Sequence, residues 1–277
     1  MIEIDALPQL RDPVLVVALA GWVDAGLAGG GTVALLQEQL ESARTFARLD
    51  LADLMDLQQT RPTVHLVDGV SRQIAWPEIT LSAGRLGRDV VLCTGPEPSL
   101  RWRELLGEIV DLARRLGTAA AFTVGGIPSM ASHRRPLSVL ATGTDEELVA
   151  RAGAWRQDYT GPTGAQSVVQ VMLGDVGIPT LALWAQVPHY LAGGASPPAI
   201  RAVLERLRDL GGLAVDLAGL DEQSDAYLRR VEEGLADRPD VVEVIQAIEA
   251  GEASEAELPS GDELASEIER FLRDQSS

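Results

Sequence analysis

The sequence contains no lysine, and all 23 of its basic residues are arginine. A phosphate-binding P-loop, a Schiff base and the catalytic centre of protein kinases each need a lysine, so these three kinds of site are excluded. Basic residues of any kind are few, and the formal net charge is −18. Because nucleic acids bind to cationic surfaces, we expect no nucleic-acid partner.

Cysteine is nearly absent as well, since Cys93 is the single thiol of the chain. One cysteine excludes an internal disulfide and suits a reducing compartment. Cys93 lies in the apolar run DVVLCTG, which favours a buried structural thiol over a nucleophile. The first residues lack the pattern of a signal peptide, and Asp24 interrupts the apolar residues 14–36 in a way that argues against a membrane span. We expect a cytoplasmic protein that does not contact membranes.

Four apolar runs have the composition of strands that are buried on both faces of a parallel sheet. They are residues 14–20, 89–94, 119–124 and 178–185. Residues 63–76 read as a hairpin, because Asp68 and Gly69 suit a type I′ turn. Helical patterns alternate with the strands. The sequence therefore predicts an α/β protein whose mixed sheet is parallel in the middle, with the hairpin at one antiparallel edge.

Capping signals mark the starts of two of the helices. Ser99 is the expected N-cap of a helix that runs to about residue 116, with an apolar stripe that begins at Trp102. Ser196 is the expected N-cap of a second helix, which Pro197 begins and Gly212 ends.

The chain changes character near residue 218. Residues 1–218 are expected to form the α/β core domain, and residues 219–277 an acidic helical appendage with helices near 220–236, 240–250 and 260–273. This appendage carries 17 acidic residues and 5 arginines, which concentrates two thirds of the net charge in it. Such a run is either a solvated outer face or a docking surface for a basic partner.

Polar residues gather after the predicted parallel strands, where ligands lie in open α/β sheets. The candidate catalytic set is Asp24, Glu97, His133 and His189, each of which follows a different strand. The candidate ligand-binding residues are Gly125, Gly126, Arg134, Tyr159, Thr163, Gly164 and Tyr190.

Structural interpretations of these residues stay open beside the functional ones. Two glycine-rich loops, GWVDAGLAGGG and YTGPTGAQS, are placed to cradle a phosphate, but neither has a lysine and Asp24 would repel the anion. For the first loop we favour tight strand-to-helix packing over phosphate binding. The arginines after His133 either bind an anion or pair with Asp24 and Glu97, and we favour the pairing. No short-spaced ligand pair accompanies the histidines, so no metal and no cofactor is expected.

Six motifs in order make the chain resemble the proteasome assembly chaperone 2 family, in its actinobacterial branch. They are GWVDAGLAG, GPEPSLRW, GGIPSMASHRRP, YTGPTGAQS, LWAQVPHYLAGGASPPA and SGDELASEIERFLR. The resemblance implies a three-layer α/β/α sandwich of the phosphorylase/hydrolase-like type and self-association, with a trimer as the expected state. Several chaperones of this group end in a hydrophobic residue, a tyrosine and any residue, which docks on the proteasome. This sequence ends LRDQSS, so docking by that route is not expected.

The resemblance implies a non-enzymatic assembly chaperone or interaction scaffold. The loops GPEPSLRW and WAQVPHYLAGGASPP are then candidate contacts between subunits, because tryptophan and tyrosine are enriched at interfaces. The alternative is a small-molecule hydrolase or phosphorylase that uses the polar residues after the strands. A third hypothesis is a ligand sensor that binds without turnover.

Overall fold

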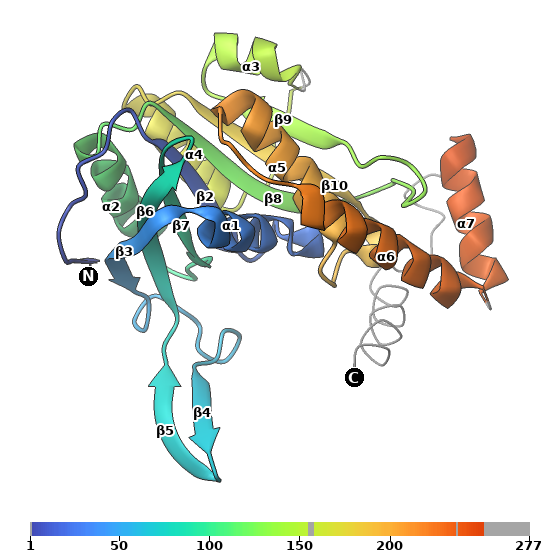
Figure 1. Cartoon of the computed structure of the whole chain (residues 1–277), viewed down its shortest axis with the longest axis horizontal. Helices are drawn as coiled ribbons and strands as arrows, with labels where there is room; N and C mark the ends of the chain where they lie inside the picture. Colours follow the sequence, from blue (N-terminus) through green and yellow to red (C-terminus); the bar gives the residue numbers. More distant parts are fainter. Residues whose placement is uncertain (1, 155–157, 237, 252–277) are drawn as a thin grey trace.

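The computed structural model describes residues 2–154, 158–236 and 238–251 (Figure 1). At its centre is an eight-stranded sheet, with strands in the order β1-β3-β6-β7-β2-β8-β10-β9. The strands are β1 Ile2–Ile4, β2 Val14–Ala20, β3 Glu41–Asp50, β6 Glu78–Leu86, β7 Arg88–Pro96, β8 Ala120–Ser129, β9 Val139–Gly143 and β10 Thr180–Pro188.

The four strands at the centre, β7, β2, β8 and β10, run parallel to one another. Val14 of β2 pairs with Val90 of β7 on one side and with Ala120 of β8 on the other. These strands are the four apolar runs, and their inner residues are almost fully buried because helices cover both faces of the sheet. The prediction of a parallel centre is confirmed.

Antiparallel strands flank the parallel centre on both sides, with β6, β3 and β1 at one edge and β9 at the other. The predicted hairpin exists as β4 Thr63–Val67 and β5 Val70–Ala75, and Asp68 and Gly69 have the positive φ values of a type I′ turn. Its predicted place at the sheet edge is wrong. The hairpin is a separate two-stranded sheet that projects away from the body of the molecule (Figure 1).

Two pairs of helices complete a three-layer α/β/α sandwich. Helices α1 Ala28–Gln39 and α5 Pro197–Gly211 pack on one face of the sheet, and α2 Trp102–Arg115 and α4 Ala165–Asp175 pack on the other. The apolar stripe predicted for α2 is buried at Leu106 and Ile109, with Trp102 half-buried at its start. The short helix α3 Glu146–Ala152 follows β9.

The two predicted caps have different outcomes. Ser196 caps α5 as expected, since its Oγ accepts a hydrogen bond from the Ala199 amide and Gly212 ends the helix with φ of 66°. Ser99 does not cap α2, because Arg101 precedes that helix in the left-handed conformation. The Oγ of Ser99 instead accepts a hydrogen bond of 2.9 Å from the Asp56 amide and ties two loops together.

The first two helices of the acidic appendage are confirmed as α6 Ala218–Leu235 and α7 Pro239–Ala250. They enclose a small apolar core of their own, in which Val231 and Ile245 pack with Tyr190 of the short helix η2 His189–Leu191. The helix predicted over 260–273 lies outside the described residues, and the domain boundary at 218 stays a prediction. No described helix is long and apolar enough to cross a membrane.

Candidate functional site

The carboxyl ends of β2, β7, β8 and β10 lie on one rim of the sheet, because these strands run in the same direction. The loops that follow these strands carry Asp24, Glu97, His133 and His189. All four candidate catalytic residues therefore lie on this rim.

Asp24 lies before helix α1, and its side chain contacts the first turn of that helix. Its Oδ1 accepts hydrogen bonds from the amides of Gly29, at 2.7 Å, and Gly30, at 3.4 Å. Burial raises the pKa of the Asp24 carboxyl, and these two hydrogen bonds act in the opposite direction. The first turn of a helix carries unpaired amides, so an acceptor here stabilises α1. The Asp24 carboxylate thus has a structural role, because it is hydrogen-bonded to the first turn of α1.

Gly125 and Gly126 of β8 lie beneath the loop that carries Asp24. The Gly126 amide donates to the Val23 carbonyl at 3.1 Å, and Asp24 forms an isolated parallel bridge with Gly126. A Cβ on Gly125 would lie 2.3 Å from the Val23 oxygen, and one on Gly126 would lie 2.1 Å from the Ala25 oxygen. The space beside these candidate ligand-binding glycines is therefore filled by the chain itself.

Glu97 joins two other loops of the rim. Its Oε2 accepts a hydrogen bond from the Trp22 amide at 3.3 Å, and its Oε1 accepts one from the Ala165 amide at 2.5 Å. Ala165 is the first residue of α4, so Glu97 supplies the anionic partner that this helix start favours. The carboxylate therefore holds the loop after β2 and the start of α4 in one place.

The YTGPTGAQS loop lies beside Glu97. Gly164 is the N-cap of α4, and a Cβ there would lie 3.0 Å from Glu97 Oε1. Tyr159 and Thr163 are exposed, and the Tyr159 hydroxyl donates to the Pro162 carbonyl of its own loop. Of these three candidates, Gly164 is the one that lies beside the candidate catalytic residue Glu97.

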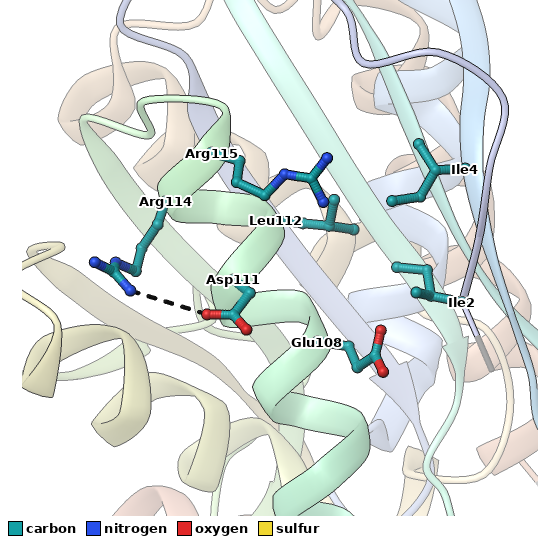
Figure 2. A pocket seen from close by; sticks show the side chains of 7 residues that line it. All are labelled: Ile2, Ile4, Glu108, Asp111, Leu112, Arg114 and Arg115. Atoms are coloured by element: carbon teal, nitrogen blue, oxygen red, sulfur yellow. Dashed lines mark ion pairs between the residues drawn. The ribbon is translucent and has the colours of Figure 1, made fainter.

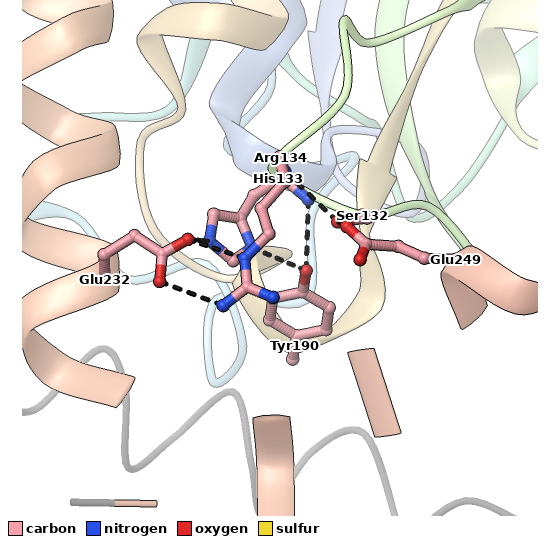
Figure 3. Close-up of polar contacts among 6 residues, drawn as sticks. All are labelled: Ser132, His133, Arg134, Tyr190, Glu232 and Glu249. Carbon is pink, nitrogen blue, oxygen red and sulfur yellow. Dashed lines mark hydrogen bonds and ion pairs between the residues drawn. The ribbon is translucent and has the colours of Figure 1, made fainter. Parts of the chain in front are cut away.

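His133 is the centre of a second group of contacts (Figure 3). Its imidazole is buried between Tyr190 and Glu232, with Nδ1 2.8 Å from the Tyr190 hydroxyl and Nε2 3.1 Å from Glu232 Oε1. The neutral ring with its proton on Nε2 satisfies both contacts, because Tyr190 then donates to Nδ1 and Nε2–H donates to Glu232.

The protonation states of this group agree with that arrangement. Burial lowers the pKa of His133 and raises the pKa of Tyr190 to about 12, so both are neutral at pH 7. The hydrogen bond from Arg134 holds the pKa of Glu232 below its usual value. The charged side chains that act on His133 are thus Glu232, Arg134 and Glu249.

Arg134 and Arg135 attach the acidic helices to the core. Arg134 forms a two-point contact with Glu232 of α6, with Nε at 2.7 Å and Nη2 at 3.1 Å from the two oxygens. Arg135 donates to the Glu249 carbonyl of α7, and Ser132 donates to the Glu249 side chain (Figure 3). The predicted pairing of these arginines with Asp24 and Glu97 is wrong, because Arg134 contacts the Glu232 carboxylate and Arg135 a backbone carbonyl of α7.

His189 is linked to His133 through Tyr190, whose ring both imidazoles meet edge-on, at centroid distances of 5.3 and 5.8 Å. Burial lowers the pKa of His189 too. Among the described residues, however, no hydrogen bond or ion pair joins Asp24 or Glu97 to either histidine. The rim therefore holds two separate polar groups. Asp24 and Glu97 form one, at the loops after β2 and β7, and the two histidines belong to the other, at the loops after β8 and β10.

Two cavities are relevant to ligand binding. One of about 330 Å³ lies between the His133 loop, α5 and α6, and it includes His133 and Arg134 but none of Asp24, Glu97 and His189. Another of about 550 Å³ lies between α2 and β1, which is the edge strand of the sheet. Arg114 pairs with Asp111 in its lining (Figure 2). In the described part of the chain, no group of three or more His, Cys, Asp or Glu side chains is arranged to hold a metal ion.

Sequence reasoning missed the partners from the appendage, Glu232 and Glu249. They follow His133 by 99 residues or more, and within the acidic helices nothing distinguishes them from their exposed neighbours.

Comparison with known proteins agrees with this fold. The profile of the PAC2 family matches residues 18–235. The chain belongs to the PAC2 family. The match extends past residue 218 and takes in helix α6. Comparison with curated proteins gives no match.

Solved structures of actinobacterial proteins are similar over most of the chain. A PAC2 family protein from Streptomyces avermitilis is 38% identical, with a TM-score of 0.77, over 84% of this chain and 99% of its own. A proteasome-assembly chaperone homologue from Mycobacterium tuberculosis is 34% identical, with the same TM-score and the same coverage of both chains. A second M. tuberculosis protein, of unknown function, is 28% identical with a TM-score of 0.83 and covers 100% of this chain and 97% of its own.

Proposed function

We propose that this PAC2 protein is a non-enzymatic assembly chaperone or interaction scaffold that works as a homo-oligomer, with three copies as the expected number. The observation that carries the proposal is that polar side chains of the rim form hydrogen bonds within the fold. Asp24 and Glu97 hold helix starts, while His133 and Arg134 hold helix α6. Three of the four candidate catalytic side chains, those of Asp24, Glu97 and His133, are therefore engaged in positioning loops and helices.

Similarity supports the same proposal. The M. tuberculosis relative at 34% identity is described as a proteasome-assembly chaperone homologue, and it matches this chain over almost its whole length. We therefore expect a protein partner of the kind that an assembly chaperone binds, and proteasome subunits are the first candidates.

The acidic helices are the surface proposed for that partner. Helices α6 and α7 are fixed to the core by the contacts of Arg134 and Arg135, so they present their outer side as a rigid face. Exposed acidic residues cover it, among them Glu222, Asp225, Glu233 and Glu243. A partner with a basic surface would be attracted to such a face and bind less tightly at high salt.

Affinity purification of the tagged full-length chain from its own cells tests the proposal. The variant E222Q/D225N/E233Q/E243Q removes four acidic charges from the appendage. The control variant E38Q/D53N/E146Q/E147Q removes the same number from exposed positions elsewhere. We expect the wild type and the control to retain a protein partner, and the appendage variant to retain at least tenfold less of it.

Recovery of the chain alone, with no proteasomal or other partner, would overturn the proposal. Equal loss of the partner from both variants would show that net charge matters and the acidic face does not.

A further inference from the structure

The cavity between α5, α6 and the loop after β8 has walls from elements that are far apart in the sequence. Helices α5 and α6 pack against each other (Figure 1). The residues that line the cavity from these helices are spaced by three or four, so each set occupies one face of its helix. They are Pro198, Arg201, Ala202 and Glu205 of α5, and Ser224, Tyr227 and Leu228 of α6.

The size of the cavity limits what it can hold. Small-molecule sites have volumes of about 300–1,000 Å³. This cavity, at about 330 Å³, is at the lower end of that range. At the ~30 Å³ that one water molecule takes up in the liquid, it has room for about ten non-hydrogen atoms. A nucleotide is too large for it, whereas a short organic acid fits.

Much of the lining is apolar. Leucine and proline side chains supply it from the loop after β8, from the end of β10 and the helix η2 that follows, and from α5 and α6. They are Pro136, Leu137, Pro188, Leu191, Pro198 and Leu228. A lining of this kind favours the hydrocarbon part of a ligand over water.

The hydroxyl of Ser224 is buried and has no hydrogen-bond partner in the described part of the chain. Ser224 belongs to α6 and is 7% exposed, and its Oγ is out of contact with solvent. A buried hydroxyl without a hydrogen bond destabilises the fold unless another molecule satisfies it. Because Ser224 lines the cavity, a ligand there can accept a hydrogen bond from it.

Arg135 brings a positive charge to the same cavity. Arg134 and Arg201 line it too, but each of them forms ion pairs with carboxylates of α5 or α6. Arg135 donates from Nη2 to the Glu249 carbonyl at 2.8 Å, and among the described residues no carboxylate forms an ion pair with it. A guanidinium has five N–H donors, so Arg135 keeps donors for an anion.

We propose that this cavity binds a small organic carboxylate with a hydrocarbon part of about eight carbon atoms or fewer. The carboxylate oxygens accept hydrogen bonds from Arg135 and Ser224, and the hydrocarbon part packs against the leucines and prolines. Such a ligand contacts α5, α6 and the loop after β8 together, so it stabilises the docked position of α6. The inference goes beyond the proposed function, which requires no small molecule.

Calorimetric titration of the full-length chain with octanoate and with benzoate tests the proposal. Octanamide and benzamide are the uncharged probes of matching size. Three variants each change one feature of the cavity: R135Q removes the charge, S224A removes the hydroxyl, and A202L fills the space. The matched controls A150L and R151Q change exposed residues of α3, which lie outside the cavity.

The wild type and both controls should bind at least one of the two acids, and the matching amide at least tenfold more weakly. R135Q and A202L should each weaken binding of the acid roughly tenfold or more, since one removes a charged donor and the other the space. A202L leaves the hydrogen bonds of Arg135 in place, so it tests the cavity without disturbing α7.

Two further measurements separate binding from a structural role. S224A should weaken binding roughly fivefold and leave the melting temperature of the free protein unchanged or higher, because it removes a hydroxyl that has no partner in the described chain. The acid at saturation should slow hydrogen exchange of the α6 amides in the wild type and have no such effect in A202L.

Failure of the wild type to bind either acid would overturn the proposal. Equal affinity for an acid and its amide would overturn it too, because the cavity would then recognise no anion. Unchanged binding by A202L would place the acid elsewhere on the chain, with the same consequence. Each of these results leaves the proposed function intact, since that function is tested by recovery of a protein partner.

Discussion

At the scale of single residues, Gly126 shows how tightly the rim is packed. The carbonyl oxygen of Ala25 lies where a side chain at position 126 would begin, at 2.1 Å from the Cβ position. The nearest atoms are the Ala25 carbonyl and the Cβ of Ala28, so no flexible side chain is there to move aside. The glycine is needed for close approach of two segments, and its φ is not in the positive range.

We predict that Gly126→Ala lowers the free energy of unfolding by about 2 kcal/mol or more, because the added methyl group forces the Asp24 loop off β8. Gly219→Ala is the matched control, since nothing lies within 4 Å of its Cβ position in helix α6. That change should be neutral or stabilising by up to about 1 kcal/mol. Urea unfolding of the two variants gives the comparison, and equal stabilities would contradict the packing described for the loop.

At the scale of helices and strands, the docking of α6 depends on a neutral His133. The pKa of this imidazole is lowered by burial from its ordinary value of 6.5. A group whose pKa is lower in the folded state takes up its proton first in the undocked state. The stabilising contribution is therefore complete above pH 6.5 and declines as the pH falls below it. Glu232 follows the same direction, but only below its ordinary pKa of 4.5.

We predict that protection of the α6 amides against hydrogen exchange, corrected for intrinsic rates, is weaker at pH 5.5 than at pH 7.5 in the wild type. One proton changes the docking equilibrium by at most about tenfold per pH unit. His133→Gln should remove this difference, while His65→Gln, on the exposed strand β4, should keep it. A wild type with the same protection at both values would show that His133 does not govern the docking.

The elements also show what the sequence could and could not predict. The parallel strands were predictable because burial on both faces makes them continuous apolar runs, and the bounds of residues 14–20 agree with β2. Strands β3 and β6 were not predicted, because they are partly exposed and their pairing is irregular. The register shifts between Glu41 and Arg44 and between Thr45 and Ala47. A pattern of period two is lost at such irregularities.

The candidate site was predictable in position and not in role. Its residues follow the parallel strands, and the topology alone places them on one rim. The role of Glu97 depends on Ala165, 68 residues later, and the role of Arg134 depends on Glu232. Such pairings are set by how loops and helices pack in three dimensions, and no local spacing records them.

At the scale of the whole molecule, charge and apolar surface are separated. The acidic residues are concentrated on the appendage, while the hairpin β4–β5 exposes apolar side chains and carries only Asp68 and Arg72 as charged residues. A chain built in this way can associate with itself at one place and attract a basic partner at another. The central claim is therefore that the working form is an assembly of several copies.

Native mass spectrometry of the full-length chain tests that claim most directly. The account predicts a dominant species at an integer multiple of 29.5 kDa, with three copies expected, that persists at low micromolar concentration. A single species at 29.5 kDa over the whole concentration range would contradict it.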